Sequence, residues 1–181
     1  MPNRNAAFRL LTANEQLAEP RLSRLFEDWQ RAALWRGLPG TSFADPLHLR
    51  YLLGSLVLID VVRDGLGRRR FRYRLVGTNI VDRQGKDRTG TWLDRHGESD
   101  FAAAALKVCN LVAEQRQPVY AGISRRLLGR YYPVEFLVLP MGGKQVERLI
   151  AAQLYPDNAP LCPYGIDASA QIDAEALAAT G

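Results

Sequence analysis

The sequence predicts an α+β domain built on a five-stranded antiparallel sheet, with helices packed on one face and further helices at the N-terminus. Two observations predict this class. Strand-like segments fall into two groups, at residues 56–75 and 119–155, and a helical block separates them. A doubly wound parallel sheet would instead alternate strands with helices along the chain. We therefore expect the helical block to cover the inner face of the sheet and to leave a cavity beneath it.

The chain has the size and composition of one globular domain. It has 181 residues, 47% of them apolar and 24% charged, which excludes wholesale disorder and a fibrous repeat. Residues 1–19 show no clear period, and we expect a mobile lead-in there. Residues 20–155 form the domain with its N-terminal flanking helices. Residues 156–181 are rich in Pro, Ala and Asp, and we expect a C-terminal tail with one weak helix at 174–179.

Two helices are expected before the sheet. From Pro20 to about Gly37, apolar residues recur at steps of three and four, and the opposite side is charged. Such a helix has one apolar stripe and must pack against something. A second, short helix is expected from Asp45-Pro46, which supply an N-cap residue and a first-turn proline, to about Gly54.

A hairpin follows. Residues 56–62 (LVLIDVV) are aliphatic and β-branched and predict a buried strand, and 64–67 carry turn residues. Over the next strand, alternation places one set of side chains on each face. The exposed face carries Arg68, Arg70, Arg72 and Arg74, and the inner face carries Phe71, Tyr73 and Leu75.

The second half begins with a glycine-punctuated segment, 77–97, where loops and one or two helical turns are expected. A longer helix is expected from about residue 99 to 116, because apolar residues follow a helical period until Pro118. Three strands then complete the sheet, at 119–126, 130–139 and 147–155. Residues 141–144 (MGGK) join the last two as a hairpin turn.

Several of these segments resemble the PAS domains, and in particular the bacterial single-domain PAS_5 family. The resemblance extends over about residues 25–155. It lies in Trp29, in 45–47 (DPL), in 58–60 (LID), and most specifically in 71–78 (FRYRLVGT) with 85–90 (GKDRTG); Glu135 and 139–140 (LP) complete it. The resemblance implies a PAS-like fold, a ligand-sensing or partner-binding role and no catalytic activity. PAS domains share a fold and not a ligand.

The resemblance also sets expectations about cofactors, and the ligand itself is unknown. Flavin photosensors of the LOV type carry a cysteine in the short helix after the second strand, where this chain has Ile80 or Val81. Haem-binding members use a histidine, usually on the long helix, and here His96 lies just before that helix, beside charged residues. We therefore expect neither a covalent flavin nor haem. Cys109, on the long helix, is expected to be a buried apolar residue.

Charge and cysteine content bear on partners and compartment. The net charge is +5, almost all of the excess being arginine. The arginine row 68, 70, 72 and 74 could contact phosphate or nucleic acid, but no nucleic-acid-binding motif accompanies it, and charge commonly protects an edge strand. Two distant cysteines and two histidines make a metal site unexpected. Without a signal sequence or a membrane-spanning run, we expect a cytoplasmic protein that contacts no membrane.

These expectations define a pocket and three functional hypotheses. Residues expected to line the space between the sheet and the long helix are Phe71, Tyr73, Thr78, Asn79, Arg83, Trp92, Tyr120 and Phe136. No catalytic motif is present, so an enzyme is not expected. The first hypothesis is a stand-alone PAS sensor, a homodimer that binds a small organic ligand and acts on a separate signalling protein. The second is a ligand-free adaptor that uses the outer sheet face and the Trp29 helix. The third, weaker, is a basic regulator that contacts nucleic acid.

Overall fold

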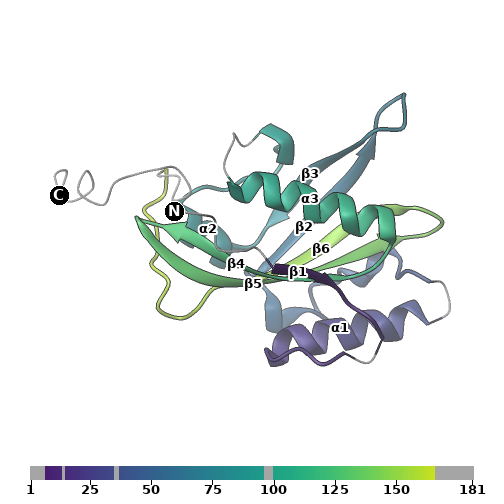
Figure 1. Ribbon diagram of the computed structural model, residues 1–181, viewed down its shortest axis with the longest axis horizontal. Coiled ribbons are helices and arrows are strands. Elements are labelled where there is room, and N and C mark those ends of the chain that lie inside the picture. The colour runs from purple at the N-terminus through teal and green to yellow at the C-terminus, as the bar shows by residue number, and fades with distance from the viewer. Residues whose placement is uncertain (1–6, 14, 35–36, 96–99, 166–181) are drawn as a thin grey trace.

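The computed structural model describes residues 7–13, 15–34, 37–95 and 100–165. Its strands form one antiparallel sheet in the order β1-β4-β5-β6-β2-β3 (Figure 1). The strands are β1 (Ala7–Leu10), β2 (Leu56–Arg63), β3 (Arg69–Val76), β4 (Val119–Leu127), β5 (Arg130–Gly142) and β6 (Val146–Leu154). The α-helices are α1 (Pro20–Ala33), α2 (Thr78–Gln84) and α3 (Asp100–Gln115). Short 3-10 turns occur at η1 (Thr41–Phe43), η2 (Arg50–Leu52) and η3 (Leu93–Arg95).

The α+β class and the antiparallel sheet agree with the sequence, but the sheet has six strands and not five. The sixth, β1, comes from the segment expected to be a lead-in. It pairs antiparallel with β4, with Phe8 opposite Ala121, and Leu11 just after it is buried. A four-residue strand is too short to show a period, so the free edge of β4 and not the local sequence defines it.

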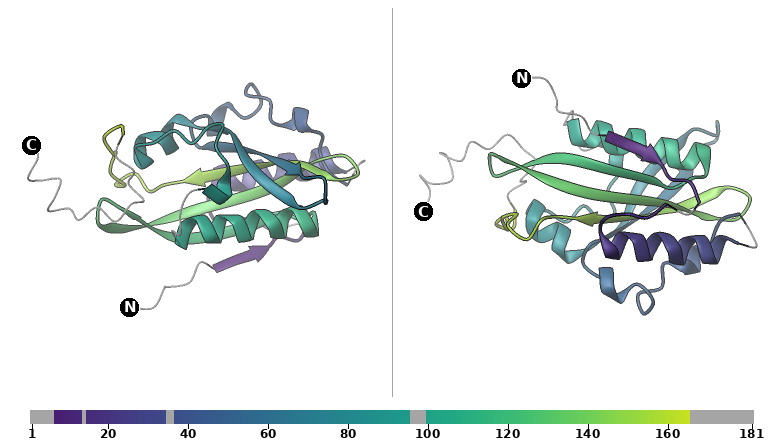
Figure 2. Two further views of the ribbon diagram at one scale, coloured as in Figure 1. Left: turned by 90° about the horizontal axis from the view of Figure 1, so that it is seen from above. Right: turned by 60° about the horizontal axis from the view of Figure 1, so that its bottom comes forward.

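Helices lie on both faces of the sheet. The sequence predicted that the helical block between the two strand groups covers one face, and it assigned no face to the N-terminal helices. Helix α3 packs across one face and α1 packs against the other (Figures 1 and 2). Helix α1 begins at Pro20 after the Glu19 cap, and its buried residues follow the 3.6-residue period: Leu22, Leu25, Phe26 and Trp29. The Trp29 indole Nε1 donates a buried hydrogen bond of 2.8 Å to the Pro140 carbonyl on β5.

The short helix expected at residues 45–54 is wrong. The segment is a series of turns that ends in η2, and Asp45 accepts a hydrogen bond from the Leu47 amide in a turn. Gly54 follows with φ +86°, and a Cβ on Gly77 would lie 2.3 Å from the Gly54 carbonyl oxygen. The chain turns back too sharply here for a regular helix, and the glycine pair lets α2 begin directly against the turn.

The β2–β3 hairpin has the expected inward residues, Phe71 and Tyr73, both buried. Leu75, expected on the same face, is 45% exposed. A bulge explains the difference: Leu58 pairs with Leu75 and Ile59 pairs with Tyr73, so Arg74 is an extra residue on β3. One extra residue reverses the alternation beyond it.

The first part of the expected C-terminal tail packs on the domain. The Cys162 amide donates to the Asp82 carbonyl at 2.7 Å, and the Gly165 amide donates to the Gly85 carbonyl at 2.8 Å. Ala159 and Cys162 form a small buried cluster with Leu127. Residues 156–165 therefore tie the end of α2 to the end of β4. The helix expected at 174–179 lies outside the described residues.

Replacing Trp29 tests the attachment of α1. We expect Trp29→Phe to lower the free energy of unfolding by about 1–2 kcal/mol, because the ring is kept while the Pro140 carbonyl loses its buried donor. Urea denaturation followed by circular dichroism measures the change. The control is Arg31→Ala on the exposed side of α1, which should shift stability by less than about 0.5 kcal/mol. Equal midpoints for Trp29→Phe and wild type would show that the hydrogen bond contributes nothing.

Candidate functional site

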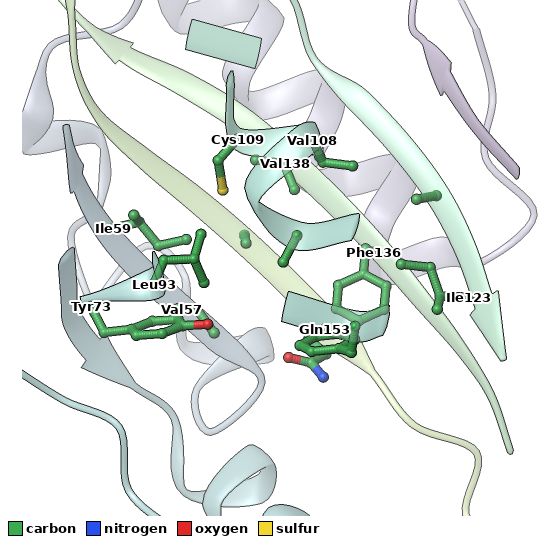
Figure 3. Close-up of a pocket in the computed structure, with 14 residues that line it drawn as sticks. Val57, Ile59, Tyr73, Leu93, Val108, Cys109, Ile123, Phe136, Val138 and Gln153 are labelled. Carbon is green, nitrogen blue, oxygen red and sulfur yellow. The ribbon is translucent and has the colours of Figure 1, made fainter. Parts of the chain in front are cut away.

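A cavity of about 50 Å³ lies between α3 and the sheet (Figure 3). Both layers contribute apolar side chains to its wall. Those from the sheet include Val57, Ile59, Phe136 and Val138, and those from α3 include Phe101 and Val108. The cavity is where the sequence placed it, under the helical block. Its wall is suited to a hydrocarbon group and not to a polar molecule.

Small side chains create this space. Ala105 on α3, Ala121 on β4 and Ala151 on β6 all line the cavity. Larger side chains in the same layers hold the helix and the sheet apart, so the alanines leave a gap. One buried water needs roughly 10–15 Å³ of such volume. The space therefore takes a few water molecules or a small organic group, and a flavin or a haem would require α3 to move.

Two polar groups lie inside the apolar part of the wall. Burial raises the pKa of the Tyr73 hydroxyl well above its ordinary value, and the Cys109 side chain and the Tyr155 hydroxyl add to the rise. Burial alone raises the pKa of the Cys109 thiol to about 12. Both groups are therefore neutral at physiological pH, and the thiol is a poor nucleophile.

A cluster of buried polar side chains adjoins the cavity at Gln153, and we call it the polar end. Gln153 lines the cavity and its Nε2 donates to the Tyr155 hydroxyl at 2.5 Å. Gln84 Nε2 donates to the same oxygen at 3.2 Å, and Arg125 Nη1 donates to it at 2.8 Å. The Arg125 guanidinium also lies 3.9 Å from the centre of the Phe101 ring, which lines the cavity. Gln84, Gln153 and Arg125 are each less than 5% exposed.

The structure brings together only part of the expected pocket. Tyr73 and Phe136 line the cavity. Phe71 is fully buried on the same face of β3 but lies outside the wall, in the core. Thr78 and Asn79 are exposed on α2, where Asn79 Nδ2 donates to Ser55 Oγ at 3.3 Å.

Three further expected residues lie away from the cavity wall. Arg83 stacks over the Tyr155 ring at 5.6 Å, near the polar end. Trp92 pairs with Arg72 beside β3 and lies on the opposite face of the sheet. Tyr120 also faces that side, where its hydroxyl donates to Glu135 Oε2 at 3.1 Å. His96 lies outside the described residues.

The sequence analysis missed the polar end, although a signal for it was present. Arg125 falls two residues after Ile123 and four after Ala121, so alternation places it on the inner face of β4. Gln153 follows Ala151 on β6 in the same way. A charged or amide side chain at an inward strand position marks a buried polar site. Contacts with Gln84 and Tyr155 depend on α2 and the end of β6, which the sequence does not place.

The arginine row is largely paired with acids of the chain itself. Arg68 Nε lies 2.7 Å from Asp64, and Arg70 Nε lies 3.0 Å from Asp94. Arg70 and Arg72 also lie over the Trp92 ring, at 4.2 and 5.8 Å from its centre. The row therefore contacts acids and an aromatic ring of the chain itself.

Asp60 is the acid on which three arginines of the outer face converge. Its carboxylate accepts a 2.9 Å hydrogen bond from Arg148 Nε. It also forms ion pairs of 3.6 Å with Arg72 and Arg74. The Asp60 side chain is only 14% exposed, so this half-buried carboxylate anchors positive charge from both β3 and β6.

An antiparallel sheet with a long helix across one face and a ligand-sized gap beneath that helix is the architecture of a PAS domain. The PAS_5 family model, described as a PAS domain, matches residues 17–152. The chain belongs to this family.

Other comparisons add little to the family match. The chain is similar to a solved structure of an RNA-binding light-oxygen-voltage receptor, with 13% sequence identity and a TM-score of 0.47. The match covers 85% of this chain and 39% of that one, so the chain spans well under half of the receptor's length. No curated protein matches the sequence. Among the described residues, no helix combines the length and hydropathy needed to cross a bilayer.

Removing the Asp60 charge tests the outer ion cluster. We expect Asp60→Asn to lower the free energy of unfolding by about 1–3 kcal/mol, because three guanidinium groups lose their shared anion. Chemical denaturation measures the change. Asp157→Asn, at an exposed position, makes the same change in net charge and should be nearly neutral. An equal loss in both variants would mean that net charge and not the cluster matters.

Thiol labelling tests the burial of Cys109. In a Cys162→Ala background, Cys109 is the remaining cysteine. We expect it to react with a disulfide reagent at pH 8 at least about a hundredfold more slowly in the native protein than in urea, because burial suppresses both access and the thiolate. Absorbance of the released thiol follows the reaction. Rapid native labelling would show that α3 opens readily over the cavity.

Proposed function

We propose that this PAS domain is a sensor that holds a small organic molecule in the cavity under α3 and that performs no catalysis itself. The observation that supports this most directly is the cavity, an apolar space with one polar end. Such a combination suits a ligand that has a hydrocarbon body and one polar group. The high pKa of the Cys109 thiol supports a binding and not a catalytic role for the wall.

The alternative of a ligand-free adaptor has less support, because little of the outer sheet face is left exposed for a partner protein. That hypothesis uses the outer face of the sheet and the Trp29 helix, and α1 itself covers β5 on that face through the Trp29 contact with Pro140. The exposed outer surface that remains belongs mainly to β3 and carries the paired arginines. A partner protein would meet a charged surface there and not an apolar one.

The cavity is linked to the outer surface of β3 through Leu93 and Trp92. Leu93 in η3 lines the cavity and is 2% exposed. Its neighbour Trp92 pairs with Arg72 on the other side of the β3 edge and lies under the Arg70 guanidinium. A ligand that displaces Leu93 therefore shifts Trp92 and the arginines that pack on it. We propose this segment as the two-state element through which a separate signalling protein detects the ligand.

Filling the cavity tests the proposal. We expect Ala105→Leu to occupy the space and abolish binding of a small amphiphile, since Ala105 lines the wall from α3. Suitable probes are butanamide, titrated and followed by nuclear magnetic resonance shifts, and any compound that native mass spectrometry finds on the purified protein. Stability should hold or rise, because the added methyl groups enter an existing void.

The matched control for this test is Ala103→Leu. Residue 103 is exposed on the same helix, so the substitution adds the same groups outside the cavity and should leave binding unchanged. Wild type that binds neither a co-purified compound nor butanamide, nor its acid, would show a closed core and no ligand site. Binding that survives Ala105→Leu would place the ligand elsewhere.

A further inference from the structure

The polar cluster beside the cavity contains a buried cation, Arg125, that meets no anion among the described residues. Arg125 is 3% exposed, and its Nε is buried with no hydrogen-bond partner. Within the described residues its side chain donates to the Tyr155 hydroxyl, and its guanidinium lies over the face of the Phe101 ring. Neither partner is a carboxylate. A guanidinium taken out of water is costly unless an anion accompanies it.

Hydrogen-bond donors also outnumber acceptors around Tyr155. Gln84, Arg125 and Gln153 all donate to the one phenol oxygen, whose lone pairs suffice for two hydrogen bonds. Arg83 adds a second guanidinium against the same ring, and its Nε is likewise buried and unbonded. The cluster therefore has surplus N–H groups and surplus positive charge. Its chemistry is complementary to an acceptor-only, negatively charged group.

The cluster is continuous with the apolar cavity. Phe101 lines the cavity, and the Arg125 guanidinium lies 3.9 Å from the centre of its ring. Gln153 reaches both regions, since it lines the cavity and donates to Tyr155. In Figure 3 the Tyr73 hydroxyl points toward the side of the cavity where Gln153 lies. A molecule in the cavity thus meets hydrocarbon along its length and donors at one end.

We propose that the ligand of this domain is a small monocarboxylic acid, with its hydrocarbon body under α3 and its carboxylate held by Arg125 and Gln153. The planar guanidinium matches the two oxygens of a carboxylate, and the Gln153 amide supplies a neutral donor beside it. The volume of the cavity restricts the body to about three carbon atoms. This assignment rests on the proposed function and names the class of molecule that the sensor detects.

A matched pair of probes tests the acid assignment on the full-length wild-type chain. Butanoate and butanamide have the same shape and differ in charge, and each is titrated by calorimetry and by nuclear magnetic resonance. We expect butanoate to bind at least about tenfold more tightly, because a charge-assisted pair with Arg125 replaces an uncharged contact. In Arg125→Gln this preference should disappear. Arg126→Gln, on the same strand but on the opposite face, should keep it.

The outcomes separate this inference from the proposed function. Equal or tighter binding of butanamide by wild type overturns the acid assignment and leaves a sensor of neutral molecules. Binding of neither probe overturns the acid assignment, and it overturns the sensor as well when native mass spectrometry finds no co-purified compound. Butanoate that still binds to Ala105→Leu would be held by surface arginines, which also overturns the assignment. The wild-type comparison decides the question even where Arg125→Gln does not fold.

Discussion

The burial of β5 and β6 on both faces is the constraint on which the rest of the structure depends. Residues 136–142 of β5 and 149–154 of β6 are buried without a break. Neighbouring residues of a strand point to opposite faces, so an unbroken buried run requires a cover on each side. Helix α3 covers one face, and α1 covers the other through Trp29. The edge strands, the turns at 37–53 and the C-terminal segment 156–165 cover the remaining sides of the core.

The two covers differ in how closely they fit, and that difference locates the site. Large side chains, Phe26 and Trp29 among them, fill the α1 side. On the α3 side, alanines from the helix and from two strands meet and leave the cavity. A core normally packs to the density of an organic crystal, so a gap lined by alanine is a specific feature. The gap is also asymmetric, because its wall is hydrocarbon except at Gln153, which connects it to the Arg125 and Tyr155 cluster.

The arginines of this chain fall into two groups that differ in environment. On the outer face of β3, the guanidinium groups form ion pairs with acids of the chain or lie over the Trp92 ring. Water screens these exposed charges further. Arg125, on the inner face of β4, contacts the Phe101 ring and the Tyr155 hydroxyl. Alternation places each side chain on its face, and both placements could be predicted from the strands. Which acid or ring contacts each arginine depends on residues distant in sequence, so these contacts could not be predicted.

The sequence alone determined the order and type of the main elements, because helix α1, the β2–β3 hairpin, helix α3 and the last three strands have strong local periods. It also determined that Tyr73 and Phe136 face the cavity. Only the tertiary structure decided the sixth strand, the α1 cover and the positions of Trp92 and Tyr120 on the far face. A four-residue edge strand exists only where another strand offers free hydrogen bonds, and a side chain beside a sheet edge takes its face from pairing. The periodicity of the sequence predicts neither the edge strand nor the face of such a side chain, since both arise from contacts between segments far apart in the chain.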